Sequence, residues 1–222
     1  LIFPDVKDYT YYEEQYPVRN LPEGARVTRF APSPTGFVHI GGIYQSLIAK
    51  LMTKDQGVFF IRIEDTDQTR YVEGAVQFIY DTLKVCNMHI DEGPLEGGNY
   101  GPYTQSERVD LYKKYAEELV EKGYAYYCFC SEERLEKLRE EADIRKVAFM
   151  YDGHCQKLSK EEVQAKIAAG EKYVIRQKMP KEGTTSYEDI VYGKISVDNN
   201  LLEDQILLKS DGYPTYNFAN VI

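Results

Sequence analysis

The 222-residue sequence contains no stretch near the roughly 18 consecutive apolar residues that a membrane-spanning helix needs. Residues 1–13 lack the basic segment followed by an apolar one that marks a secretory signal peptide. We therefore expect no membrane association, no signal peptide and a cytoplasmic location. With 43 % hydrophobic and 28 % charged residues, the composition excludes wholesale disorder, collagen and coiled coil.

Cysteine is scarce. The chain has four cysteines, Cys86, Cys128, Cys130 and Cys155, too few for a disulfide framework in a chain of this length. They favour cytosolic thiols or a metal site. Cys86 falls alone at the end of a predicted helix, where a thiol usually serves only packing.

Basic residues are outnumbered, because 27 Lys and Arg stand against 36 Asp and Glu, giving a net charge of −9. This balance excludes a protein that grips nucleic acid mainly through bulk electrostatics. It leaves open a protein that touches nucleic acid over only part of its surface.

The first half of the chain alternates strand and helix patterns. Residues 27–31 and 58–63 read as strands, and apolar residues at helical spacing follow each of them, over about 41–56 and 73–86. Gly57 stands where a helix C′ glycine belongs. Strands and helices in this order, with short connections, predict an α/β fold with a parallel sheet and right-handed crossovers.

The pattern changes after about residue 91. We expect a helix over 107–122, a helix capped by Ser131, a helix that Ser159 opens with a capping box, and strands within 173–179 and 205–209. The predicted organisation is an N-terminal extension (1–24), the first half of the sheet domain (25–107), a mixed α+β insertion (108–211) and the start of the second half (212–222).

The segment from Arg29 to Gly42 carries the most chemical information, because a strand there leads through a Pro/Gly loop to a helix N-terminus. Helix N-termini present unpaired N–H groups and attract phosphate. His39 could donate a hydrogen bond to a phosphate oxygen, and Gly41 would allow close approach. Equally, His39 could only cap the helix. Neither a Walker A pattern nor G-x-G-x-x-G is present, so P-loop and dinucleotide-binding interpretations lose their support.

Four stretches resemble, in order, the signatures of bacterial glutamyl-tRNA synthetases, which are class I aminoacyl-tRNA synthetases. They are residues 28–42 (TRFAPSPTGFVHIGG), 62–67 (RIEDTD), 101–108 (GPYTQSER) and 210–220 (SDGYPTYNFAN). The "HIGH" tetrapeptide appears as residues 39–42. The resemblance implies a Rossmann-like catalytic domain, interrupted by an insertion that binds the tRNA acceptor arm. It also implies ATP- and Mg²⁺-dependent activation of L-glutamate to glutamyl-adenylate, and transfer to the terminal ribose of tRNA(Glu) by a monomer.

The resemblance also implies site residues. The glutamate-binding positions are Arg29, Ser33, Glu64, Tyr216 and Asn220; the ATP-binding positions are Ala31, Thr35, His39 and Gly41; and the catalytic "HIGH" residues are His39, Gly41 and Gly42. An arginine can hold a carboxylate with two parallel hydrogen bonds, and a glutamate can pair with an ammonium group. Taken singly, isolated polar residues such as these are more often structural, and it is the resemblance that favours the functional interpretation.

Some family features are missing or altered. The "KMSKS" signature and the helical anticodon-binding domain are not in these residues, so we expect a catalytic fragment that is inactive alone and holds tRNA weakly. Cys128, Cys130 and Cys155 follow the spacing of a zinc site in some family members, but Lys157 stands where the fourth ligand, a histidine, would be. The sequence therefore favours idle thiols over zinc.

Other functions remain open. The nearest alternative is the truncated relative that glutamylates queuosine in tRNA, which lacks an anticodon domain. A non-catalytic tRNA-binding paralogue would be expected to lose Arg29, His39 or Glu64, and all three are present. A glutaminyl enzyme usually replaces the 31–35 run, and a metabolic nucleotidyltransferase would not carry the stretches at 62–67 and 213–220.

Overall fold

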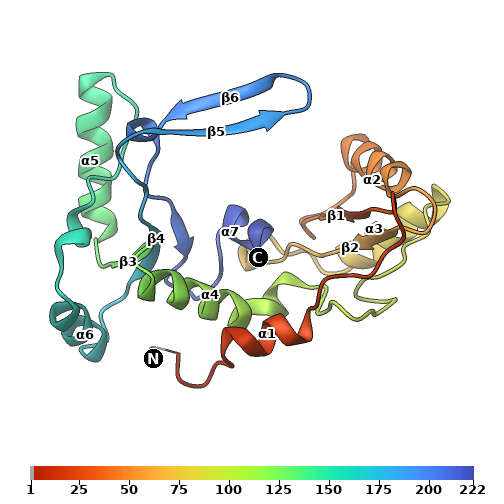
Figure 1. Cartoon of the computed structure of the whole chain (residues 1–222), viewed down its shortest axis with the longest axis horizontal. Coiled ribbons are helices and arrows are strands. Elements are labelled where there is room, and N and C mark those ends of the chain that lie inside the picture. Colours follow the sequence, from red (N-terminus) through yellow and green to blue (C-terminus); the bar gives the residue numbers. More distant parts are fainter. Residues whose placement is uncertain (1–2) are drawn as a thin grey trace. The chain divides into compact units, whose positions relative to one another are not determined.

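The computed structural model describes residues 3–222 of the chain, which divide into two compact units, Asp5–Leu111 and Tyr112–Ile222, the latter joined by residues 3–4 (Figure 1). Within the described residues, no helix combines the length and the apolar character needed to cross a membrane.

The Asp5–Leu111 unit is built on a parallel sheet. β1 (Val27–Phe30) pairs with β2 (Val58–Ile61) in parallel, from Val27 opposite Val58 to Phe30 opposite Ile61. Single parallel bridges, Phe60 to Glu92 and Ile63 to Thr104, continue the hydrogen bonding on the other side of β2. The predicted parallel sheet is confirmed.

Two helices complete the pattern. α2 (Ile40–Thr53) connects β1 to β2, and α3 (Ala75–Val85) follows β2. A buried apolar cluster fills this unit: Phe30, Phe59, Ile61, Ile63, Ile79, Tyr80, Leu83, Met88 and Ile90. Phe78, one of the apolar residues at helical spacing over 73–86, is not part of this cluster: it is 39 % exposed and packs edge-on against Phe37.

The end of α2 differs from the prediction. The helix stops at Thr53, and Lys54 rather than a glycine takes the positive φ that ends it. Gly57 lies further along, where a Cβ would come within 2.4 Å of the Arg26 carbonyl oxygen and closer still to that of Thr53. Close backbone approach, not helix capping, is therefore what requires glycine at position 57.

The N-terminal residues of this unit are also ordered. α1 (Tyr9–Gln15) is capped by the Asp8 side chain, which accepts from the amide of Thr10. Two 3₁₀ turns, η1 (Gln68–Arg70) and η2 (Gln105–Arg108), follow β2 and precede α4 (Val109–Glu121).

The Tyr112–Ile222 unit is mixed. β3 (Ala125–Cys128), β4 (Val174–Gln177) and β7 (Ile206–Leu208) form an antiparallel sheet in the order β3-β4-β7, and β5 (Thr184–Asp189) and β6 (Gly193–Asp198) form a separate hairpin. Its helices are most of α4, from Tyr112 on, and α5 (Glu132–Arg145), α6 (Lys160–Ala168) and α7 (Tyr216–Val221), with 3₁₀ turns η3 (His154–Lys157) and η4 (Asn199–Leu201).

Both predicted caps in this unit are confirmed. Ser131 accepts from the amide of Arg134 at the start of α5, and Ser159 and Glu162 form a reciprocal capping box at the start of α6. β3 and the β5–β6 hairpin were not predicted. β3 is only four residues long and β5 is exposed along almost its whole length, whereas residues 194–198 of β6 do alternate between polar and apolar and could have been recognised as a strand.

Asp204 ties the second unit together. Its carboxylate is 1 % exposed and accepts from the Tyr126 hydroxyl at 2.7 Å, the Lys181 ammonium at 3.0 Å, the Met179 amide at 3.1 Å and the Gln156 side-chain amide. Burial alone would raise the pKa of Asp204, but these donors outweigh it and hold the pKa below its usual value.

Candidate functional site

The loop between β1 and α2 carries the predicted nucleotide-binding positions. Thr35 donates its amide hydrogen to the Ser33 carbonyl at 2.9 Å, which makes a tight turn around the buried Pro34. Ser33 and Thr35 are exposed and Ala31 is half-buried. The turn therefore presents polar side chains to solvent just before a helix N-terminus.

His39 is the N-cap of α2. Its Nδ1 accepts a hydrogen bond from the Gly41 amide at 3.1 Å, so the structural role considered for this histidine is real. Because Nδ1 uses its lone pair in this bond, the proton of the neutral ring belongs on Nε2. The same imidazole therefore caps the helix and keeps an N–H donor available at its exposed end.

Two glycines follow His39 at the start of α2. A Cβ on Gly41 would lie 2.8 Å from His39 Cε1 and 3.0 Å from its Nδ1. A Cβ on Gly42 would lie 3.1 Å from Val38 Cγ1. Gly41 is thus required for the imidazole to reach its capping position, whereas a Cβ on Gly42 would meet the side chains of Val38 and, at 3.7 Å, Phe30.

Arg29 and Glu64 lie on neighbouring strands and their extensions. Arg29 is half-buried on β1 opposite Phe60, and the Glu64 amide donates to the Pro32 carbonyl at 2.9 Å. The Glu64 side chain accepts from Arg62 Nε at 3.3 Å and Gln105 Nε2 at 3.2 Å. Both bonds go to Oε1, which leaves Oε2 to accept from a further cationic or polar group.

The neighbouring acids are engaged within the protein. Asp65 is held by the Ser106 amide at 2.8 Å and its hydroxyl at 2.5 Å. Asp67 accepts from Thr69 and from Arg70 at 2.6 Å, and these hydrogen bonds lower the pKa of Asp67 to about 2. Only the cysteine cluster described below gathers three or more metal-ligating side chains among residues 3–222.

Tyr216 and Asn220 belong to the other unit, on α7. Thr215, at the N-cap position, donates its hydroxyl to the Ile206 carbonyl at 2.8 Å and so fixes the start of the helix. Tyr216 is 63 % exposed and lines a cavity of about 480 Å³ together with Arg139. Asn220 is half-buried. The roles predicted for these two residues stay predictions.

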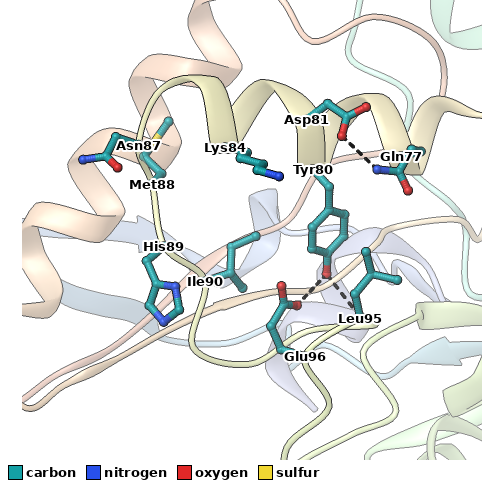
Figure 2. A pocket seen from close by; sticks show the side chains of 10 residues that line it. All are labelled: Gln77, Tyr80, Asp81, Lys84, Asn87, Met88, His89, Ile90, Leu95 and Glu96. Atoms are coloured by element: carbon teal, nitrogen blue, oxygen red, sulfur yellow. Dashed lines mark hydrogen bonds between the residues drawn. The ribbon is translucent and has the colours of Figure 1, made fainter.

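The Asp5–Leu111 unit has a cavity of its own, which none of the predicted site residues lines. This cavity of about 420 Å³ lies between α3 and the loop that follows it (Figure 2). Its lining residues are Gln77, Tyr80, Asp81, Lys84, Asn87, Met88, His89, Ile90, Leu95 and Glu96. Tyr80 donates to Glu96 at 3.0 Å and accepts from the Leu95 amide at 3.4 Å, so the phenol group in its wall is already hydrogen-bonded.

The three cysteines of the second unit gather in one place. The sulfur atoms of Cys128, Cys130 and Cys155 lie within 4.8 Å of one another, and the Tyr151 hydroxyl is 3.3 Å from the first and 3.2 Å from the second. A hydrogen bond from the Cys155 thiol is the main cause that lowers the pKa of Cys128, against the effect of burial. The cluster thus brings three cysteine sulfur atoms and a phenol oxygen together, and the sequence pattern did not reveal Tyr151.

The comparisons agree with this geometry. The family "tRNA synthetases class I (E and Q), catalytic domain" matches residues 26–222. The chain belongs to this family, and the class I fold expected from the sequence is confirmed.

Within this family, the curated proteins that resemble the chain include glutamate–tRNA ligases. The chain is 60 % identical to a glutamate–tRNA ligase of Clostridium botulinum over 196 residues, and 59 % identical to that of Clostridium acetobutylicum. Each alignment covers 88 % of this chain and 40 % of the relative, so the chain spans about two fifths of the length of these proteins.

Solved structures give the same result. A crystal structure of a glutamate tRNA ligase from Elizabethkingia meningosepticum, in complex with its amino acid, superposes with a TM-score of 0.82 at 43 % identity. It covers 90 % of this chain and 41 % of the solved one. The glutamate-tRNA synthetase of Elizabethkingia anophelis matches equally well, with a TM-score of 0.82.

Proposed function

We propose that this chain is the catalytic part of a glutamyl-tRNA synthetase, which activates L-glutamate with ATP and transfers it to the terminal ribose of tRNA(Glu). The observation that carries the proposal is the His39 cap on α2. The chain runs from β1, which bears Arg29, through the loop 31–39 to the N-terminus of α2, where His39 Nε2 can donate a hydrogen bond.

The amino acid would be bound by charge. Arg29 can hold a carboxylate of glutamate with two hydrogen bonds, and Glu64 can accept the α-ammonium at Oε2, which Arg62 and Gln105 leave unused. Ser33, Tyr216 and Asn220 would add neutral hydrogen bonds that fix orientation.

ATP would be bound at the N-terminus of α2, next to Ala31, Thr35, His39 and Gly41. The reaction joins the substrate carboxylate to the α-phosphorus and releases pyrophosphate, and positioning and stabilisation of charge supply most of the rate. The His39 Nε2–H would donate to a phosphate oxygen as negative charge develops there.

The acids of the 62–67 stretch do not fit a protein-held magnesium site. Asp65 and Asp67 already accept hydrogen bonds from Ser106, Thr69 and Arg70. We therefore propose that Mg²⁺ enters on the nucleotide phosphates, where it would neutralise their charge.

The cysteine cluster fits zinc better than the sequence suggested. Cys128, Cys130 and Cys155 would supply three sulfur ligands, and the Tyr151 oxygen, which lies close to two of these sulfur atoms, would be the fourth ligand in place of Lys157. A bound zinc ion would link the end of β3 to η3 and stabilise this unit.

The test of the proposed function uses the protein made from its complete reading frame. We expect glutamate-dependent exchange of pyrophosphate into ATP, with tRNA supplied, and glutamate attached to tRNA(Glu). Replacing Arg29 with Ala should raise the KM for glutamate at least ~100-fold, because a doubly bonded carboxylate is lost. Glutamine accepted in place of glutamate, or no exchange with either, would contradict the proposal.

A further inference from the structure

Residues 5–24, which we call the N-terminal strap, precede the region matched by the family, which begins at residue 26. The strap nevertheless belongs to the same compact unit as β1 and β2. It contacts residues 92–103 of that unit, and the Tyr16 ring of the strap also lies beneath the Arg108 guanidinium, 5.6 Å from it. We call residues 92–103 the edge loop, because both of its ends pair with β2 or the residues just after it.

The strongest contact joins Arg19 of the strap to Glu92 of the edge loop. The guanidinium makes two hydrogen bonds to the carboxylate, Nη1 to Oε1 at 2.7 Å and Nη2 to Oε2 at 2.5 Å. It also lies over the Tyr100 ring, 3.6 Å from the ring centre. The side chains of Arg19 and Glu92 are 17 % and 15 % exposed, so the pair is largely shielded from water.

Two further hydrogen bonds hold the strap to the loop. The Tyr16 hydroxyl donates to the Gly101 carbonyl at 2.7 Å, and the Tyr100 hydroxyl donates to the Pro17 carbonyl at 2.9 Å. On α3, Tyr80 holds the same loop by its bond to Glu96 (Figure 2). The strap thus fixes the loop at several points, with Arg19 at their centre.

The edge loop in turn leads to Glu64. Glu92 accepts from the Tyr103 hydroxyl at 2.6 Å, and the Tyr103 carbonyl accepts from the Ile63 amide at 2.9 Å. Gln105 donates its amide to the Ile63 carbonyl at 2.9 Å and its side chain to Glu64 Oε1 at 3.2 Å. The position of the Glu64 carboxylate, which is expected to hold the substrate ammonium, therefore depends on Tyr103 at the end of the edge loop and on Gln105 just after it.

We propose that Arg19 is a positioning residue for the amino-acid site, acting through Glu92 and the edge loop on Glu64. The proposal rests on the proposed function, because it assigns the substrate ammonium to Glu64. Without Arg19, the Glu92 carboxylate would be a shielded charge that has lost its cation, and it would reorganise together with the loop that it braces. The nucleotide-binding segment 31–41 meets these contacts at the backbone hydrogen bond from the Glu64 amide to the Pro32 carbonyl. A shift of the Glu64 side chain leaves that backbone bond in place, so ATP binding should not change.

An arginine is needed for this role because one planar group makes both bonds to Glu92 and stacks on Tyr100. A lysine would keep the charge and lose the second bond and the flat stack. Arg19→Lys should therefore keep only part of the effect of Arg19 on the glutamate site. A partial effect would show that the geometry of the guanidinium matters, and not its charge alone.

The test compares Arg19→Ala, Arg19→Lys and a control, Arg26→Ala, in the protein made from its complete reading frame. Arg26 lies in the same unit, and among the described residues its side chain makes no ion pair. In glutamate-dependent exchange, Arg19→Ala should raise the KM for glutamate about 10-fold, with kcat and the KM for ATP within about 3-fold of the parent. The KM for glutamate of Arg19→Lys should lie between those of Arg19→Ala and the parent, and that of Arg26→Ala should match the parent.

A second measurement does not depend on activity. Hydrogen–deuterium exchange at the amides of Ile63 and Gln105 should be at least ~10-fold faster in Arg19→Ala than in the parent. Exchange at the amides of Thr35 and Val72, which are bonded to the loop between β1 and α2, should stay as slow as in the parent. Unchanged exchange at Ile63 and Gln105 would overturn the proposal, as would an Arg19→Ala enzyme with the parent's KM for glutamate. A parent protein that does not use glutamate would refute only the proposed function. Hydrogen–deuterium exchange, which needs no activity, would still decide the role of Arg19.

Discussion

The Nδ1 atom of His39 accepts a hydrogen bond from the backbone amide of Gly41, 3.1 Å away, at the first turn of α2. One side chain thus has a structural task at Nδ1 and a chemical task at Nε2. The two tasks can be separated by substitution, because asparagine can cap a helix but cannot place a donor where Nε2 lies.

We expect His39→Asn to keep the stability of the protein within about 0.5 kcal/mol and to lower the rate of adenylate formation about 100-fold or more. His39→Ala should show the same loss of rate and an added loss of about 1 kcal/mol of stability, since the cap is gone. Thermal unfolding and pyrophosphate exchange measure the two effects. Full activity in His39→Asn would mean that His39 is only a cap.

Gly41→Ala tests the same contact from the other side. The added methyl would stand 2.8 Å from His39 Cε1, so the imidazole must leave its capping position. We expect about a 100-fold loss of exchange rate with a small effect on folding. Gln45→Ala, an exposed change on the same helix, is the control and should be silent. If Gly41→Ala retained the parent's rate, the placement of His39 would not matter for the chemistry.

Much of the first unit could be predicted from the sequence, because its order is written in local patterns. The two strands, the parallel pairing and the helix start near His39 all follow from apolar runs and turn residues. The details that failed depend on tertiary contact. Phe78 lies on the helical stripe but meets Phe37 at the surface, and Gly57 is required by the carbonyls of Thr53 and Arg26 rather than by a helix end.

Asp204→Asn should destabilise the second unit. The amide removes a buried charge on which Tyr126, Lys181 and the Met179 amide converge, and we expect a loss of about 3 kcal/mol at pH 7. Because the folded pKa lies below the unfolded one, the carboxylate's contribution is complete above about pH 4 and is lost as the pH falls through the folded pKa.

Urea unfolding at several pH values measures this. The gap between parent and Asp204→Asn should be widest near neutral pH and should narrow in acid. Glu182→Gln, an exposed acid in the same unit, is the control and should change little at any pH. A gap that is constant from neutral to strongly acidic pH would show that the charge of Asp204 does not stabilise the fold.

Zinc content tests the cysteine cluster. Protein purified without added metal should carry about one zinc ion per chain, and Cys155→Ser should lose it. Tyr151→Phe should weaken retention against a chelator, because the fourth oxygen is removed, and Cys86→Ser should behave as the parent does. Metal-free protein whose three clustered thiols react freely with a thiol reagent would contradict the assignment.

The rest of the candidate site could not be predicted, because its parts are far apart in the chain. Nothing in the spacing of Cys128, Cys130 and Cys155 points to Tyr151, which joins them only when η3 folds against β3. Residues 5–24 likewise carry turn signals and no motif. Their role depends on the Arg19–Glu92 pair, which is 73 residues apart in sequence.

The decisive measurement is aminoacylation by the protein made from its complete reading frame, with parent and His39→Asn proteins side by side. We expect the parent to attach glutamate to tRNA(Glu), and His39→Asn to fold as the parent does but to form the adenylate about 100-fold or more slowly. Transfer of another amino acid, or no transfer of glutamate by a folded parent protein, would contradict the proposed function.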